Sequence, residues 1–115
     1  MSQELLDRVA LHDLVMRYCR GCDRRDFALV RSLYHDDAVD DHGVMFKGGP
    51  DDFVAWLPSV TGQWSLTRHS LSNSLFVIDG DRGAIPCAPP VTTARLPMSR
   101  CITFIPRLAD ARPRR

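Results

Sequence analysis

Three residues of this 115-residue sequence have the chemistry needed to move a proton: Tyr18, Asp23 and His69. A carboxylate beside an imidazole fixes the tautomer of the ring and raises its basicity, so Asp23 would make His69 a general base. The Tyr18 hydroxyl, five residues before Asp23, can donate to a developing oxyanion or to a leaving hydroxyl group. Such a set suits the removal of a proton next to a carbonyl, or from a carbon that bears a leaving group.

His69 belongs to the stretch Thr67–Asp81, which we predict to be a β-strand that ends in a tight turn. Its residues alternate with period two, and Asp79-Gly80 is a pair typical of hairpin turns. The odd-numbered face is mostly aliphatic and is expected to look into the core; it carries His69, Leu71, Asn73, Leu75 and Val77. A buried polar group without a partner costs about 1–3 kcal/mol, so His69 needs one. We expect that partner to be Asp23.

Apolar residues at three- and four-residue intervals predict two helices before this strand. The first spans residues 3–22, with Ser2 as its N-cap and an apolar stripe of Leu11, Leu14, Val15, Tyr18 and Cys22. Asp26 can cap a second, shorter helix. Its stripe is formed by Phe27, Val30, Leu33 and Tyr34.

A short hairpin and a third helix should complete the order of elements. Ala38–Asp41 and Val44–Lys47 can pair around His42-Gly43. Pro50 suits the first turn of the third helix, which is expected to stop near Pro58. The order helix, helix, hairpin, helix, strand predicts the α+β class, with the helices on one side of an antiparallel sheet.

Composition excludes several classes of protein. The hydrophobic fraction of 44% and the charged fraction of 25% are ordinary for one soluble globular domain. No apolar run approaches the ~20 residues of a membrane span, and no leader-like segment opens the chain, so no membrane association and a cytoplasmic location are expected.

Residues 83–115 differ in composition from residues 1–82. They hold six of the eight prolines and six arginines against one acid, whereas residues 1–82 have 9 basic and 13 acidic side chains. Prolines at this density oppose both ladder pairing and helix interiors. We interpret residues 83–115 as an Arg/Pro-rich tail, either disordered or frameshifted. The alternative is a basic tail for nucleic acid, but the arginines are scattered, so no nucleic-acid partner is expected.

Neither the cysteines nor the acidic loop predicts a metal site. Cys19 and Cys22 have C-x-x-C spacing, but a zinc site would need a second close pair, and a redox motif would need a βαβ pattern. The cysteines are interpreted as small packing groups. A second group of possible ligands lies in the predicted loop and hairpin, where acids prefer turns and solvent. Its members are His35, Asp36, Asp37, Asp40, Asp41 and His42.

Four segments together resemble the SnoaL-like branch of the NTF2-like superfamily. They are YCRGCDRRDF, LYHDDAV, DDFVAWL and TRHSLSNSLFVIDGDR, and the resemblance covers about residues 5–82. Within that branch they are similar to the bile-acid 7α-dehydratase, scytalone dehydratase and hexachlorocyclohexane dehydrochlorinase families. The resemblance implies a cone of N-terminal helices on a curved antiparallel sheet. Since family members continue through further strands, residues 1–82 would be a truncated domain with an incomplete sheet.

The resemblance also implies a function. His69 would be the base, Asp23 its partner and Tyr18 the hydroxyl donor of a cofactor-free lyase, dehydratase or isomerase that acts on a small hydrophobic molecule. Asn73 would line the pocket, and Trp56 and Phe46 are interpreted as core or as the pocket wall against the substrate. Whether the shortened chain is itself an enzyme stays open. The alternative is a non-catalytic binding or assembly module, such as the small subunit of a ring-hydroxylating dioxygenase; dimers or trimers would require a complete sheet.

Overall fold

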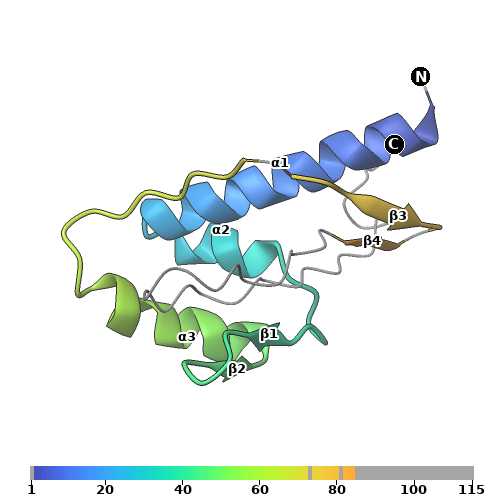
Figure 1. The fold of residues 1–115 in the computed structure, drawn as a ribbon. Helices are drawn as coiled ribbons and strands as arrows, with labels where there is room; N and C mark the ends of the chain where they lie inside the picture. The colour runs from blue at the N-terminus through green and yellow to red at the C-terminus, as the bar shows by residue number, and fades with distance from the viewer. Residues whose placement is uncertain (1, 73, 81, 85–115) are drawn as a thin grey trace, which may run out of the picture.

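The computed structural model describes residues 2–72, 74–80 and 82–84, and these residues form an α+β structure (Figure 1). Its elements, in chain order, are α1 (Gln3–Asp23), α2 (Phe27–Ser32), β1 (Asp40–Asp41), β2 (Lys47–Gly48), α3 (Pro50–Thr61), β3 (Val77–Asp79) and β4 (Arg82–Ala84). The predicted α+β class is confirmed, and the predicted order of elements is present with β4 added at its end. The described strands form two separate two-stranded sheets, however, and not the one sheet that was predicted.

The first two helices begin where their capping residues predict. The Ser2 side chain accepts a hydrogen bond from the Leu5 amide at 3.3 Å, and Asp26 accepts one from the Leu29 amide at 3.1 Å. Each bond satisfies an amide that has no partner inside its own helix. Only Arg24, Arg25 and Asp26 separate the two helices. The short α2 packs against the C-terminal half of α1, where Gly21 faces Val30.

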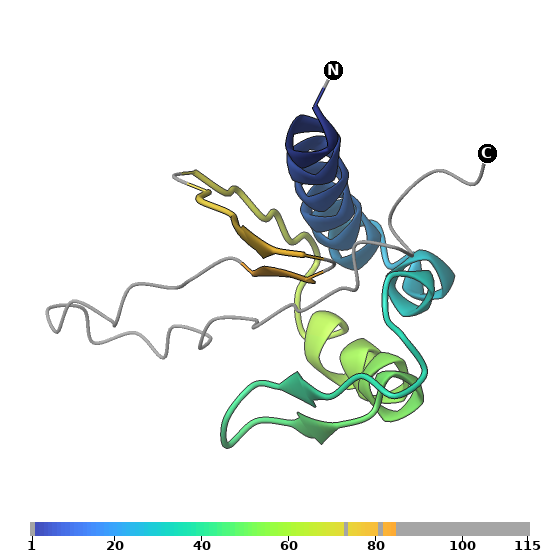
Figure 2. The ribbon, with the colours of Figure 1, turned by 90° about the vertical axis from the view of Figure 1, so that its right-hand side faces the viewer.

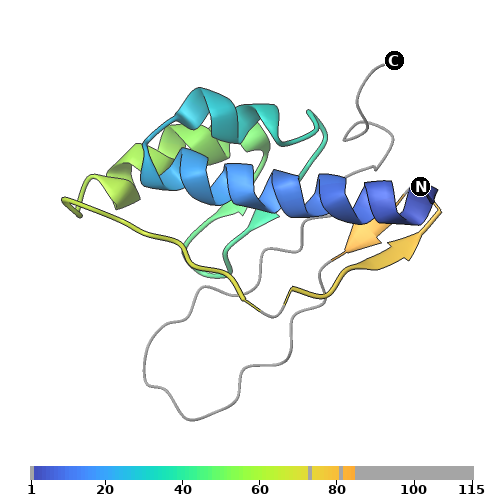
Figure 3. The same cartoon turned by 90° about the horizontal axis from the view of Figure 1, so that it is seen from above.

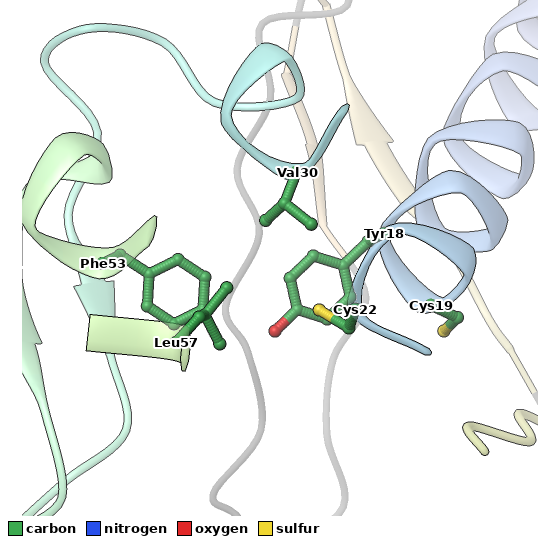
Figure 4. Packing of buried hydrophobic residues seen from close by; sticks show 6 residues of the cluster. All are labelled: Tyr18, Cys19, Cys22, Val30, Phe53 and Leu57. Carbon is green, nitrogen blue, oxygen red and sulfur yellow. The ribbon is translucent and has the colours of Figure 1, made fainter. Parts of the chain in front are cut away.

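The three helices share one buried cluster, which consists of Tyr18, Cys19, Cys22, Val30, Phe53 and Leu57 (Figure 4). The predicted stripe of α1 supplies Tyr18 and Cys22, while Val30 of α2 and Phe53 of α3 are completely buried. Burial of each large side chain contributes about 1.5–3 kcal/mol, so this cluster is what holds the end of α1 to α2 and α3.

The predicted end of the third helix is wrong, because α3 passes through Pro58 and reaches Thr61. A proline inside a helix removes one backbone donor, yet the carbonyls around it keep partners. The amide of Gly62 donates to the Pro58 carbonyl at 2.9 Å, and the Thr61 hydroxyl donates to the Leu57 carbonyl at 3.0 Å. The extra turn carries the chain on to Trp64, near the end of α1.

The predicted hairpin is present but is shorter and shifted. β1 and β2 pair antiparallel, with Asp40 opposite Gly48 and Asp41 opposite Lys47. The turn spans residues 42–46 and is closed by a bond from the His42 amide to the Phe46 carbonyl at 2.7 Å. The hairpin lies against α3 (Figures 1 and 2).

The long strand predicted over Thr67–Asp81 is wrong for most of its length. Only Val77–Asp79 forms a strand, and the preceding residues run back along α1 (Figures 1 and 3). The odd face is not in the core either, since Leu71, Leu75 and Val77 are 54%, 66% and 52% exposed. The physical reason is that a period-two pattern makes a strand only where another strand pairs with it, and in the described part of the chain none does so over residues 67–72.

The Asp79-Gly80 turn is confirmed. β3 and β4 pair antiparallel around it, and Gly80 has φ +59°, a conformation that side chains oppose. Gly83 of β4 faces α1 closely, because a Cβ built on it would be 2.6 Å from Leu11 Cδ1. β4 crosses the domain boundary predicted at residue 82, and the rest of the predicted tail, residues 85–115, lies outside the described residues.

The contact between α1 and α2 gives a stability prediction at Gly21. A Cβ added there would meet Val30 Cγ2 at 2.7 Å, so Gly21→Ala should lower the free energy of unfolding by about 1–3 kcal/mol despite its better helix propensity. Chemical denaturation of the full chain measures this. In a Val30→Ala background the same change should cost much less; an equal cost in both backgrounds would show that this contact does not limit the packing.

Candidate functional site

The predicted contact between Asp23 and His69 is present. Asp23 is the last residue of α1, and its two carboxylate oxygens both bind His69, 46 residues further on. The His69 amide donates to Oδ2 at 2.7 Å, and ring Nδ1 lies 2.6 Å from Oδ1. Backbone and ring are thus both held, so the imidazole has a fixed direction relative to α1.

The pair lies at the surface rather than in a core. The side chains of His69 and Asp23 are 44% and 19% exposed. Partial burial of Asp23 opposes its ionisation, but hydrogen bonds from the His69 amide, the His69 ring and the Thr67 hydroxyl outweigh this, and the pKa of the carboxyl lies below its usual value. Asp23 is therefore ionised at neutral pH and acts only as an acceptor.

Tyr18 is close to the pair, but its hydroxyl belongs to the core. The rings of Tyr18 and His69 are 6.4 Å apart between centroids and meet edge to face at 76°. Burial raises the pKa of Tyr18 far above its usual value, and the Cys22 sulfur accepts a hydrogen bond from its hydroxyl. Tyr18 therefore stays protonated at neutral pH and can only donate.

A second carboxylate–imidazole pair, not predicted as a pair, lies around β1. Asp40 has no exposed side-chain surface; one of its oxygens accepts from the Tyr34 hydroxyl at 2.7 Å and the other contacts His42 Nδ1. The expectation that Asp40 prefers solvent is wrong, because these two partners satisfy the buried carboxylate. Asp40 and His42 are two residues apart, a spacing that puts side chains on one side of an extended chain. Because His42 was expected in the turn of the hairpin, beyond the predicted strand Ala38–Asp41, this signal was missed.

The aromatic residues proposed for the pocket wall surround this second pair. Phe46 and Trp56 stack at 5.1 Å, and the His42 ring stacks on Phe53 at 5.3 Å. Phe46 and Trp56 pack against the same cluster as Tyr18 and are partly buried. Asn73, the third predicted pocket residue, lies outside the described residues.

The Cys19 and Cys22 side chains are free and buried. Burial raises the pKa of Cys22 to about 11, so its thiol stays protonated and is a poor nucleophile or ligand. Over the residues described, no three His, Cys, Asp or Glu side chains gather as a metal site would require. Nor does any helix there have the length and apolar character that a bilayer crossing needs.

The hydrogen bond from the Tyr34 hydroxyl to the buried Asp40 gives a prediction about the free energy of unfolding. Tyr34→Phe should lower the free energy of unfolding by about 1–3 kcal/mol, because Asp40 loses a donor that water cannot replace. Urea denaturation of the full chain measures it. In an Asp40→Ala background the same change has lost its partner and should cost clearly less; equal costs would mean that the hydrogen bond is not responsible.

The exposed pair predicts a stability term that depends on pH. The pKa of Asp23 is lower folded than unfolded, so its contribution is present above the unfolded value, near pH 4, and is lost as the pH falls through the folded value. The stability difference between wild type and Asp23→Asn should therefore be constant near neutral pH and shrink as the pH falls below about 4. Asp13→Asn, an exposed carboxylate on α1, is the control, and a difference independent of pH would contradict the assignment.

Comparison with known proteins gives one match. The profile of the SnoaL-like domain family matches residues 3–88. No curated protein and no solved structure is similar enough to match the chain. The matched range contains all of the described elements, both carboxylate–imidazole pairs and Tyr18. With three quarters of its sequence inside this match, the chain belongs to the SnoaL-like domain family, whose fold is NTF2-like.

Proposed function

We propose that this chain is a SnoaL-like domain of the lyase type, in which Asp23 and His69 remove a proton from a small hydrophobic substrate without a cofactor. The observation that carries the proposal is the double hold of His69 by Asp23, through the backbone amide and ring Nδ1. A purely structural link would need only one of these bonds. Holding both fixes the ring as well as the chain, which is what a general base requires.

The geometry assigns the two ring nitrogens. Because Nδ1 faces an ionised carboxylate, the neutral ring carries its proton there, and Nε2 keeps the lone pair. Nε2 has no hydrogen-bond partner among residues 2–72, 74–80 and 82–84, so it is the nitrogen that would accept a substrate proton. Asp23 would stabilise the imidazolium that forms.

The reaction would be an elimination of water. Nε2 takes the proton from the carbon next to a carbonyl, the electrons of that C–H bond form a C=C bond, and the C–O bond to the β-hydroxyl breaks. The imidazolium returns the proton to the leaving hydroxide, so the products are an enone, water and the starting enzyme. Tyr18, which stays protonated, would donate to the carbonyl or hydroxyl oxygen once the substrate draws its hydroxyl from Cys22.

Membership of the family supports an enclosed site, because it implies the NTF2-like fold. In the NTF2-like cone, helices cover a curved sheet, and Phe46, Trp56 and Asn73 would line the space between them. The described sheets have two strands each, so closing the cone would need further strands over the 67–76 segment. We propose that the active form has such a cover.

A second candidate function is a non-catalytic assembly module, such as a dioxygenase small subunit. Exposed apolar side chains along residues 64–77 favour it, since a partner would remove them from water. They are Trp64, Leu66, Leu71, Leu75 and Val77. In this function the Asp23–His69 bond would only tie the segment to α1.

The two functions differ in turnover. The aldol adduct of benzaldehyde and acetone is a suitable probe, because its dehydration gives an enone that absorbs in the near ultraviolet. His69→Ala and Asp23→Asn should each lower the rate of the full chain by about 10²–10⁴-fold, the usual loss for a general base. His12→Ala, an exposed histidine on α1, should change nothing. Equal rates in all four proteins would leave the assembly module as the function.

A further inference from the structure

The Arg25 side chain connects three separate parts of the chain beside the candidate pair. Its Nη1 donates to the Asp23 carbonyl at 3.0 Å and to Thr67 Oγ1 at 3.1 Å. Its Nη2 donates to the carbonyls of Thr61 and Trp64, each at 2.9 Å. One guanidinium therefore holds the end of α1, the end of α3 and the start of the segment that carries His69.

The backbone of Arg25 is also unusual. It has φ +55°, and it is the one residue other than glycine with a positive φ in the described part of the chain. A side chain in this conformation costs roughly 1–2 kcal/mol, so the surroundings must hold it there. The four hydrogen bonds of the Arg25 guanidinium offset the free-energy cost of this conformation. A strained residue with many partners next to a candidate site is a reason to ask what it positions.

Thr67 links Arg25 to the pair. Its hydroxyl oxygen accepts from Arg25 Nη1, and the Thr67 hydroxyl is among the groups that lower the pKa of the Asp23 carboxyl. Two residues later, His69 gives its amide and ring to the same carboxylate. Arg25 Nη1 thus contacts both sides of the pair, the backbone of Asp23 and the side chain of Thr67, which lies two residues before His69.

These contacts matter because no ladder holds the segment. Residues 65–72 form neither helix nor strand. No described strand pairs with them, so backbone hydrogen bonds of a sheet do not set their position along α1. The Arg25 guanidinium holds the segment at Trp64 and Thr67, just before His69. We propose that Arg25 is the positioning residue of the Asp23–His69 pair, setting through Thr67 where the imidazole meets the carboxylate.

The geometric part of this inference stands alone, and only its consequence for catalysis rests on the proposed function. A residue that merely braced α3 would serve the Thr61 and Trp64 carbonyls, and its loss would lower stability without altering Asp23. A positioning residue must also change the environment of Asp23 and His69. Measurements on Asp23 and His69, made without any substrate, therefore distinguish a positioning role from a bracing role.

The experiment compares Arg25→Gln with Arg24→Gln in the full chain. Arg24 is the exposed neighbour on the same loop, so its loss removes the same charge without these contacts. Hydrogen exchange of the His69 amide should become about tenfold faster in Arg25→Gln, which corresponds to about 1.4 kcal/mol of local opening, and should stay unchanged in Arg24→Gln. Carboxyl-carbon NMR should show the pKa of Asp23 rising towards its usual value in Arg25→Gln alone.

Two further variants keep the inference decidable if Arg25→Gln does not fold. Arg25→Lys keeps the charge but lacks the planar fork that reaches four acceptors, so it should behave like Arg25→Gln. Thr67→Val removes the shared hydroxyl and should also speed exchange of the His69 amide. If Arg25→Lys and Thr67→Val both leave His69 exchange and the Asp23 pKa as in wild type, the inference is overturned. If the Arg25 variants alter His69 exchange and the Asp23 pKa but the wild-type chain shows no turnover, the proposed function is rejected and the inference about Arg25 stands.

Discussion

The carboxylate of Asp23 determines the path of a chain segment that lies 46 residues further on. Both of its oxygens bind His69, and the Arg8 guanidinium holds the other end of the segment through the Phe76 carbonyl at 2.9 Å. Between these points the described residues rely on no ladder partner. The segment thus crosses α1 from its C-terminal to its N-terminal half because of side-chain bonds, where most sheet proteins would use backbone bonds (Figure 3).

The two carboxylate–imidazole pairs differ in what surrounds them, and the different roles that we propose for them rest on that difference. Asp40 and His42 are enclosed by Tyr34 and a stack of rings, so their bond mainly satisfies a buried charge and fixes the β1–β2 hairpin to α3. Asp23 and His69 are partly exposed, and Nε2 of the ring has no hydrogen-bond partner among the described residues. Proton exchange with a substrate needs access as well as a partner, and of these two pairs Asp23 and His69 have both.

Local features of the fold could be predicted from the sequence because local chemistry decides them. Ser2 and Asp26 cap helices, Gly80 adopts a positive φ, and the Leu11, Tyr18 and Cys22 stripe faces the interior. The Asp23–His69 contact could be predicted from the resemblance. The argument that an inward histidine needs a partner was wrong in its premise, because the His69 side chain is 44% exposed. Among the predictions that failed, the long strand depends on a distant pairing partner that a period-two pattern cannot identify. The burial of Asp40 depends on Tyr34 and His42, which are near in sequence, but acids in a predicted loop or turn are usually solvated. The contacts of Arg25 could not be predicted from the sequence, because arginines in a loop are usually solvated.

The exposed odd face of the segment decides how the imidazole behaves. Residues 69, 71, 75 and 77 have the same parity, and an extended chain turns such residues to one side. Leu71, Leu75 and Val77 leave apolar surface in water there, which favours a molecule or chain that covers it. An apolar molecule or chain that covers Leu71 will also lie over His69, two residues away. Covering the ring would remove water from it and strengthen its bond to Asp23, because a charge–dipole contact is worth more in a medium of low polarity. The same surface that favours a partner would therefore also activate the base, and the two candidate functions share one physical requirement.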